Sequence, residues 1–368
     1  MNIKRLLITA AAGIIAIFAL RSPLSASEIT PESAANTLCV TLVGPAFIIP
    51  DESQATIAVH AGALPGVAFV SLNTGHSEGR IPIRQRFLAA SMPEDADALT
   101  LALSDGTGVR ISSVDVAHRQ VKSTEVFGGL DVQLAVFTQN GRYLLGVTTK
   151  GAVFKVDLIA RKIEVMGDVT LRAASIAVSP TNTKLYVAGD GVTVIDIDHM
   201  RVASQLTAEQ NLLEVAASPD GHTLILRNWH DIELFDLEGK KNGEARASAV
   251  VDPVPNGASV NSTSRLAVAA DGSSLFYIKA SGMGSELISL SMSDLHIEAR
   301  STIGPYPNAI AIVPDRRWVL FTAGVSGQEH LEAVDMKTHA VIFKAALPGM
   351  PSTSSQRSDR CSSTSNAL

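Results

Sequence analysis

The chain has 368 residues, of which 46% are hydrophobic and 18% charged, and its formal net charge is −6. An acidic chain without blocks of Lys or Arg is a poor candidate for binding nucleic acid or an anionic membrane surface. The length is sufficient for a large hydrophobic core, and the low charged content is typical of a compact β protein.

The first 27 residues have the pattern of a secretory signal peptide. Lys4 and Arg5 form a positive start, residues 6–20 are apolar, and the small residues 25–27 offer a cleavage site. At about 1.5 Å of helical rise per residue the apolar run reaches roughly 22 Å, short of the ~30 Å hydrocarbon core of a bilayer. We therefore expect cleavage and export to the periplasm or the medium, with an uncleaved N-terminal anchor as the alternative. Cleavage removes three basic residues and no acidic one, which changes the formal charge from −6 to −9.

A unit of four short β-rich runs follows, and it is clearest from Ser175 to Leu206. Its runs begin at Ser175, Lys184, Val192 and Val202, and Pro, Asn and Gly residues separate them. These residues favour tight connections, so the unit predicts a four-stranded antiparallel meander. The run from Val192 has apolar residues on both faces, which indicates a sheet covered on both sides. Repeats stacked face to face, as in a propeller or a solenoid, supply that cover.

A turn marker between the first and second runs gives the repeat its register. It recurs at positions 50, 93, 139, 180, 219, 270 and 314, in steps of 39 to 51 residues. Seven markers predict seven blades. The predicted fold class is all-β, a seven-bladed β-propeller of four-stranded antiparallel blades that occupies residues 37–347.

A second marker ends the third run of each unit. It is Asp115, Asp157, Asp196, Asp236 and Asp335, with Asn73 and Ser291 at the matching places of the first and sixth units. We expect a side chain repeated around a ring to cap the following turn by accepting backbone N–H bonds, and not to perform chemistry.

Two of these units carry a family resemblance. Residues 184–188 with 192–196, and the turn Ala217-Ser-Pro-Asp-Gly221, resemble the YVTN-type β-propeller repeat, with Ala188-Gly189 where the name-giving Thr-Asn would stand. Similar repeats occur in surface-layer-like proteins, lactonase-type propellers, amine dehydrogenase heavy chains and the haem domain of cytochrome-type nitrite reductases. The resemblance covers roughly residues 40–347 and implies the fold; it implies little about function, because this fold hosts unrelated activities.

The two ends of the mature chain leave open how the ring closes. Thr41–Val43 and Ala340–Leu347 both have the pattern of the outer strand that completes the last blade. We expect the Ser-rich segment 348–368 to be a disordered tail. Cys39 and Cys361 lie near opposite ends, and export permits a disulfide between them; alternatively, Cys39 is a small buried hydrophobe and Cys361 stays in the tail.

The fold resemblance implies that the blade-to-blade connections and those between second and third strands emerge on one rim, which is usually the ligand face. Three of these connections hold the candidate ligand-binding residues, which are Trp229, His230, Asp231, Tyr306, Asn308, Glu329 and His330. A Trp beside an imidazole and a carboxylate can stack on a ring and hydrogen-bond a polar ligand. The alternative is that these side chains only pack and shape turns.

Signatures of cofactors and of catalysis are missing from the sequence. There is no Cys-x-x-Cys-His for haem, no His-x-His or His-x-x-x-His, no phosphate loop and no Gly-x-Ser-x-Gly. We therefore identify no cofactor, metal or catalytic residue. Propeller active sites are assembled from connections of several blades, so an enzyme is not excluded.

The leading hypothesis is an exported propeller that acts as a scaffold for a protein partner or a small-molecule ligand on that face, without enzymatic activity. It predicts no contact with nucleic acid, and none with a membrane after signal cleavage. One alternative is a lactonase-like hydrolase with a metal in the central channel. Another is the propeller subunit of a periplasmic redox enzyme, in which a separate subunit carries the cofactor.

Overall fold

The structure is a computed structural model. It describes residues 47–50, 54–59, 66–83, 85–92, 98–104, 106–168, 173–206, 211–228, 231–237, 241–245, 266–279, 285–305, 307, 309–313, 316–323 and 330–347. The predictions for the signal peptide, Thr41–Val43, the two cysteines and the tail 348–368 lie outside these residues.

The described residues form 28 strands in seven four-stranded antiparallel sheets, each a meander in chain order, and we number the sheets as blades one to seven. Blades one to three contain β1 (Phe47–Pro50), β2 (Gln54–Val59), β3 (Gly66–Ser71), β4 (Ser77–Pro82), β5 (Arg86–Ser91), β6 (Ala98–Ser104), β7 (Gly108–Asp115), β8 (Gln120–Gly128), β9 (Val132–Phe137), β10 (Tyr143–Thr148), β11 (Ala152–Asp157) and β12 (Lys162–Asp168). Blades four to seven contain β13 (Ser175–Val178), β14 (Lys184–Ala188), β15 (Val192–Asp196), β16 (Arg201–Leu206), β17 (Glu214–Ala217), β18 (Thr223–Arg227), β19 (Ile232–Asp236), β20 (Lys241–Ala245), β21 (Leu266–Val268), β22 (Ser274–Lys279), β23 (Ser285–Ser291), β24 (Ile297–Ile303), β25 (Ile310–Val313), β26 (Trp318–Ala323), β27 (His330–Asp335) and β28 (Val341–Ala346). No helix in this part of the chain is long and apolar enough to cross a bilayer.

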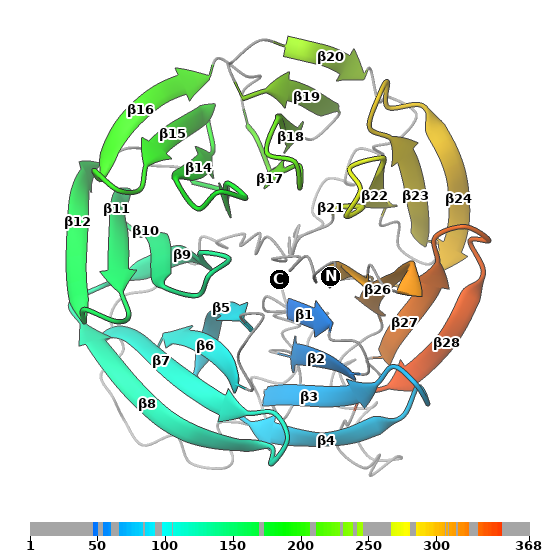
Figure 1. Ribbon diagram of the computed structural model, residues 1–368, viewed down its shortest axis with the longest axis horizontal. Helices are drawn as coiled ribbons and strands as arrows, with labels where there is room; N and C mark the ends of the chain where they lie inside the picture. The colour runs from blue at the N-terminus through cyan, green and yellow to red at the C-terminus, as the bar shows by residue number, and fades with distance from the viewer. Residues whose placement is uncertain are drawn as a thin grey trace, which may run out of the picture.

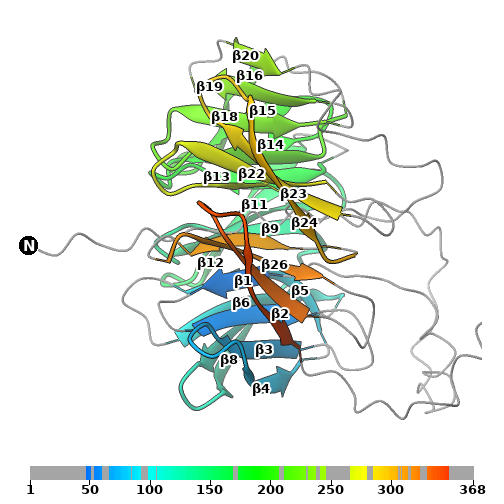
Figure 2. The ribbon, with the colours of Figure 1, turned by 90° about the vertical axis from the view of Figure 1, so that its right-hand side faces the viewer.

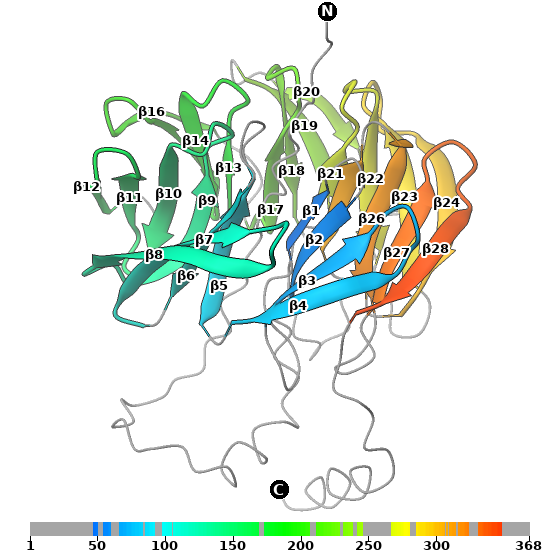
Figure 3. The same ribbon diagram turned by 60° about the horizontal axis from the view of Figure 1, so that its bottom comes forward.

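The blades stand around a ring, with the first strand of each blade innermost (Figure 1). Each innermost strand contacts the innermost strand of the next blade, and β1 contacts β25, so the ring closes between blades one and seven. The inner strands run along the short axis of the ring (Figure 2), and blade one steps outward from β1 to β4 (Figure 3). The fold is therefore an all-β propeller of four-stranded antiparallel blades.

The turn markers and the clearest unit are placed as predicted. All seven markers lie at or beside the connection between the first and second strands of one blade. The four runs that begin near Ser175 are the strands of blade four, β13 to β16. Local turn chemistry therefore sets the register of the repeat.

The last blade is completed by its own C-terminal strand. β28 pairs antiparallel with β27, from Val334 opposite Val341 to His330 opposite Ala346. The interpretation of Ala340–Leu347 as the outer strand of blade seven is confirmed. All four strands of blade seven thus come from one continuous part of the chain, Ile310 to Ala346.

A hydrophobic core lies between each pair of neighbouring blades. Between blades six and seven, for example, Phe276 and Ile278 pack against Phe321 and Val334. Both faces of a blade are therefore covered, as the apolar residues on both faces of β15 predicted. Full burial of a side chain such as Phe321 stabilises the fold by roughly 1.5–3 kcal/mol.

The turns after the third strands are capped as the repeated Asp residues predicted. Asp335 Oδ1 accepts hydrogen bonds from the backbone N–H groups of Lys337 (3.0 Å) and Thr338 (2.6 Å). Asp115, Asp157 and Asp196 accept from their own turns in the same way. These carboxylates hold turns at the rim away from the connections that were predicted to bind ligand.

The cap of blade one differs from the prediction, which placed it at Asn73. β3 ends at Ser71, and Ser71 Oγ accepts hydrogen bonds from the N–H groups of Asn73 and Thr74, both at 3.3 Å. The assignment of Asn73 was therefore wrong by two residues. A serine hydroxyl accepts the same turn bonds as a carboxylate, and Ser291 accepts from the N–H of Ser293 at the matching turn of blade six.

Candidate functional site

The connections that carry the candidate ligand-binding residues open on one rim and flank blade six. They link β18 to β19 in blade five, β24 to β25 between blades six and seven, and β26 to β27 in blade seven. Because neighbouring strands are antiparallel, these connections all lie at the same end of their blades. Trp229, His230, Tyr306, Asn308 and Glu329 lie outside the described residues.

Asp231 is one of the two candidates that the structure describes, and its backbone closes the turn before β19. The Asp231 N–H donates to Asn228 Oδ1 (2.6 Å), and the Asn228 N–H donates to the Asp231 carbonyl (3.0 Å). Asn228 is buried and Asp231 half-buried. This turn fixes the two ends of the connection on which Trp229 and His230 lie.

A buried ion pair lies at the same end of blade five. Arg227 Nε donates to Glu214 Oε2 (3.1 Å), and the two side chains are only 3% and 2% exposed. Glu214 Oε1 accepts from the N–H of Leu266, which ties blade five to the innermost strand of blade six. Arg227 Nη2 is also buried and has no hydrogen-bond partner in the part of the chain that the structure describes. Burying two charges costs free energy, and this cost is offset only when all their donors and acceptors are bonded. The open donor of Arg227 therefore indicates that the pair is not retained for stability alone.

Three side chains of blade seven, His330, Glu332 and Lys344, form a second group, which we call the Glu332 cluster. Glu332 Oε1 accepts hydrogen bonds from His330 Nε2 (2.6 Å) and Lys344 Nζ (2.7 Å). The Glu332 side chain is 0% exposed, and its Oε2 has no hydrogen-bond partner among the described residues. Burial raises the pKa of Glu332, but the bonds from His330 and Lys344 outweigh it and hold the pKa below its usual value.

Gly304, where the connection from blade six to blade seven begins, packs directly on the Glu332 cluster. A Cβ on this glycine would lie 2.5 Å from Glu332 Oε1 and 3.0 Å from His330 Nε2. A side chain at this position would displace the hydrogen-bonded pair. The connection that carries Tyr306 and Asn308 therefore starts against Glu332.

The ion pair and the Glu332 cluster face blade six from opposite sides. Side chains alternate along a strand, so Arg227 shares a face with Ile225, which packs against blade six. By the same rule Glu332 shares a face with Val334, which packs against blade six from blade seven. We call this end of blades five, six and seven the blade-six rim.

The charged residues of the blade-six rim that lie inside strands were not among the candidates predicted from sequence. They are Glu214, Arg227, Glu332 and Lys344. The search was confined to connections, but a signal was present in the strands. In each blade, the residue three positions before the third-strand marker faces the preceding blade. These residues are Ala68, Ser112, Phe154, Thr193, Glu233, Ile288 and Glu332. A carboxylate at such a buried position is unusual, and the repeat alignment singles out two, Glu233 and Glu332, of which Glu332 faces blade six.

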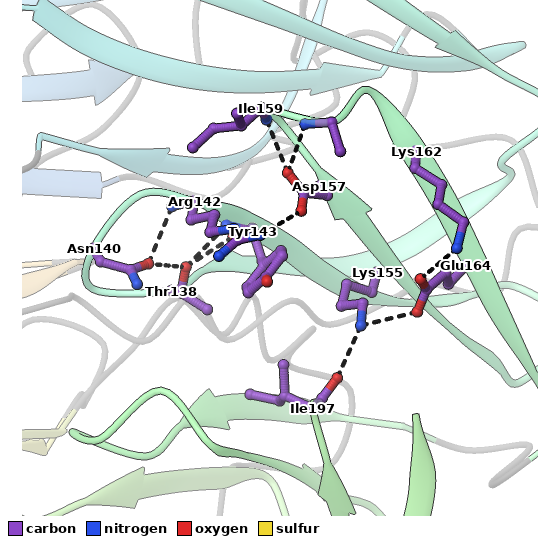
Figure 4. Close-up of polar contacts among 11 residues, drawn as sticks. Thr138, Asn140, Arg142, Tyr143, Lys155, Asp157, Ile159, Lys162, Glu164 and Ile197 are labelled. Atoms are coloured by element: carbon purple, nitrogen blue, oxygen red, sulfur yellow. Dashed lines mark hydrogen bonds and ion pairs between the residues drawn. The ribbon is translucent and has the colours of Figure 1, made fainter. Parts of the chain in front are cut away.

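Polar groups at the opposite rim are paired more completely. In blade three, Lys155 Nζ donates to the carbonyl of Ile197 in blade four (3.0 Å) and pairs with Glu164 Oε2 (2.9 Å) (Figure 4). Lys162 Nζ donates to the other oxygen, Glu164 Oε1 (2.9 Å) (Figure 4). Both oxygens of Glu164 thus have a cationic partner, and Lys155 connects the group to blade four.

The arrangement at the blade-six rim permits hydrogen bonding and charge recognition. Within the described ranges, no group of three or more His, Cys, Asp or Glu side chains could hold a metal ion. The Glu332 cluster contains one carboxylate and one imidazole, which is too few ligands for a typical protein metal site.

Comparison with known proteins supports the fold. No protein-family model matches the chain, and no curated protein matches its sequence. Among solved structures, a chain of hydrazine synthase from Kuenenia stuttgartiensis is similar, with a TM-score of 0.59 and 16% sequence identity. The similarity covers 83% of this chain and 95% of that chain. At this identity the similarity shows a common fold alone.

Proposed function

We propose that the chain is an exported, non-catalytic, seven-bladed propeller of the YVTN type that binds a protein partner or a small-molecule ligand at the blade-six rim. The observation that carries the proposal is the pair of buried charged groups with unpartnered atoms, Arg227 and Glu332, on the two sides of blade six. Unpartnered buried polar atoms are rare in native folds and concentrate where a function needs them. The seven candidate residues predicted from sequence come from the connections of the same rim.

Export is supported by the signal pattern of residues 1–27. The test is to express the whole chain in an exporting bacterial host and to measure the mass of the protein in each fraction. We expect a periplasmic or secreted protein that has lost about the first 27 residues. A full-length protein that stays in the cytoplasm contradicts this part of the proposal.

The binding function is tested on protein purified from its own exporting host, by native mass spectrometry with elemental analysis. A bound small molecule or a stoichiometric partner protein is expected. Turnover of lactones or amines at ordinary enzymatic rates, or a bound divalent metal that such turnover requires, supports the hydrolase alternative and contradicts a non-catalytic module. An experimental structure with six or eight blades contradicts the assignment as a seven-bladed propeller.

A second candidate function is a propeller subunit of a larger redox enzyme. It is favoured by the similarity in fold to a chain of a hydrazine synthase, which extends over 95% of that chain. In that case the blade-six rim would face a cofactor-bearing partner. The two candidates are separated by colour: a co-purifying partner with haem or flavin absorbance supports the redox subunit, and a colourless complex supports the binding module.

A further inference from the structure

Blades one and seven stand next to each other in the ring (Figure 1) and meet at a contact that we call the closing seam. Every other pair of neighbouring blades is consecutive in the chain, whereas the closing seam joins the first blade to the last. No sheet crosses it, because blade one comes from Phe47–Pro82 and blade seven from Ile310–Ala346. The closing seam is therefore held by packing and by contacts between side chains and turns.

The innermost strands of the closing seam, β1 and β25, carry no polar side chain. In four other pairs of neighbouring blades, a side chain ties the innermost strands together at the rim where these strands begin. The bonded pairs are Arg86 with Val132, Gln133 with Ala173, Ser175 with Val215, and Glu214 with Leu266. The sequences Phe-Ile-Ile-Pro of β1 and Ile-Ala-Ile-Val of β25 exclude a side-chain tie of this kind.

A buried hydroxyl lies unpaired at the same rim of the closing seam. Thr322 lies beside the start of β25, because its N–H donates to the carbonyl of Ala309 (3.1 Å). It shares a face with Leu320, which belongs to the core of the closing seam. Thr322 is 5% exposed, and its Oγ1 has no hydrogen-bond partner in the described part of the chain. A buried donor without a partner costs free energy, which weakens the closing seam at this rim.

The hydrophobic core of the closing seam consists of small side chains. Five of its twelve buried residues are alanine, and none is aromatic. The core between blades six and seven also has twelve buried residues, but only three are alanine and two are the aromatic residues Phe276 and Phe321. Stabilisation by burial increases with the apolar area removed from water, so the closing seam gains less from its core.

At the opposite rim, Arg316 of blade seven holds the turn between β3 and β4 of blade one. Arg316 Nη1 donates to the carbonyl of Leu72 (3.2 Å), and Nη2 donates to Asn73 Oδ1. The guanidinium group also lies 5.0 Å from the centre of the Trp318 ring, within the range of a cation–π interaction. Hydrogen bonds from a charged donor are stronger than those between neutral groups, so this rim of the closing seam is firmly tied.

The same turn packs against an aromatic pair of blade seven. Phe343 and Trp318 make an edge-to-face contact with 5.9 Å between the ring centroids. Gly75 of the turn has a φ of 67°, and a Cβ there would lie 3.2 Å from Phe343 Cδ2. The backbone of the turn therefore rests directly on the Phe343 ring, next to the residues that Arg316 binds.

We propose that the closing seam is a hinge: blades one and seven separate reversibly at the rim where β1 and β25 begin, while Arg316 and the β3–β4 turn keep them joined at the opposite rim. Opening leaves all seven sheets intact, because none crosses the closing seam. It widens the ring at the rim that also carries the connections between second and third strands. This conformational device goes beyond the proposed function and does not depend on it.

The test measures how fast a buried cysteine reacts with a thiol reagent in the folded exported protein, with peptide mass spectrometry to assign each label. Ala309→Cys probes the closing seam at the rim that opens, Val313→Cys probes it near Arg316, and Ala135→Cys probes the core between blades two and three. These positions are 2%, 3% and 0% exposed, so each cysteine reacts only when the structure around it opens. We expect Ala309→Cys to react about tenfold faster or more than Ala135→Cys, and Val313→Cys to react more slowly than Ala309→Cys.

The role of Arg316 is tested with Arg316→Met. Loss of its hydrogen bonds should raise the reaction rate of Val313→Cys by about tenfold or more. Arg142→Met is the matched control, because Arg142 also lies over an aromatic ring, that of Tyr143, but pairs with Asp157 of its own blade. It should leave the rate of Val313→Cys unchanged.

Three results would overturn the inference: Ala309→Cys reacts no faster than Ala135→Cys, Val313→Cys reacts as fast as Ala309→Cys, or Arg316→Met leaves the rate of Val313→Cys unchanged. Circular dichroism checks the fold of each variant. If Arg316→Met fails to fold, the comparison of the three cysteine probes in the protein that keeps Arg316 decides.

Discussion

Two groups in the ring use the same three kinds of side chain at opposite rims. In the Glu332 cluster, and in Asp115 with His118 and Lys122 of blade two, a carboxylate accepts from one imidazole and one ammonium group. Asp115 Oδ1 also accepts from the backbone N–H of His118, so both of its oxygens are used. Glu332 Oε2 is buried and has no hydrogen-bond partner within the described ranges.

The difference follows from where each carboxylate stands in the repeat. Asp115 ends a strand and caps a turn, where backbone N–H groups converge on it. Hydrogen bonds from Lys122 and His118 hold the pKa of Asp115 far below its usual value. Glu332 lies inside a strand whose backbone groups are engaged in the sheet, so only side chains or a ligand can satisfy it. The comparison teaches that the same residue types bond completely where a turn adds backbone N–H groups and less completely inside a strand.

The largest effect is expected from Gly304→Ala. The new Cβ would lie 2.5 Å from Glu332 Oε1, an overpacked contact that we expect to cost about 1–3 kcal/mol of stability and to displace the bond from His330. Gly128→Ala is the control, because a Cβ there meets nothing within 4 Å. Urea denaturation measures both. Equal stability of the two variants would show that Gly304 does not confine the cluster.

The next effect separates the two lysines. Lys344→Met leaves buried Glu332 with His330 alone, and we expect a loss of about 1–2 kcal/mol. Lys122→Met leaves both oxygens of Asp115 bonded, to the imidazole and the backbone N–H of His118, so we expect a smaller loss than in Lys344→Met. The two lysines are similarly exposed, at 54% and 49%, so chemical denaturation compares like with like. A larger loss of stability in Lys122→Met than in Lys344→Met would contradict the interpretation that Glu332 depends more on its lysine than Asp115 does.

Acid should distinguish the wild type from Glu332→Gln. The pKa of Glu332 in the folded protein is lowered, so its ionised form adds stability above the unfolded pKa of about 4.3, and this stability is lost as the pH falls through the lower folded value. Glu332→Gln lacks this contribution, so the stability of the variant should fall less between pH 7 and pH 3. Urea unfolding at each pH measures the slope. If stability falls with pH equally in the two proteins, His330 and Lys344 do not stabilise the ionised form of Glu332.

The smallest effect is expected in the turns that follow the third strands, at the rim opposite the blade-six rim. His339 has a φ of 57°, in the left-handed region that glycine adopts without strain. His339→Gly should therefore raise stability by about 0.5 kcal/mol, because its backbone bonds to Asp335 and Ser301 remain. Thermal unfolding detects the change, and a clear loss of stability would show that the imidazole itself supports the turn.

The fold was accessible from the sequence because local chemistry repeats in every blade. Turn residues such as Asn182 and Gly221, both at positive φ, set the register, and Asp335 and its counterparts end the third strands. Ser71 was missed because Asn73, two residues further on, is also a residue type that caps turns. In each case a few neighbouring residues determine the structure.

The candidate site could be predicted from the sequence only in part, because it depends on which blades face each other. The candidate residues were predicted from chemically rich connections, which in the chain join strands of blades five, six and seven. Glu332 and Arg227 look like ordinary strand residues until their faces are assigned to the space between blades. Their burial and their unpartnered atoms are tertiary properties that no local pattern states.

The most direct test of the central claim is hydrogen exchange, followed by mass spectrometry, on the protein with its co-purified ligand or partner and after that ligand has been removed. The account predicts protection in peptides that span Arg227–Ile232, Ile303–Ile310 and Ala323–Glu332, and unchanged exchange in the turns capped by Asp115, Asp157 and Asp335. Protection confined to those capped turns would contradict a binding site at the blade-six rim.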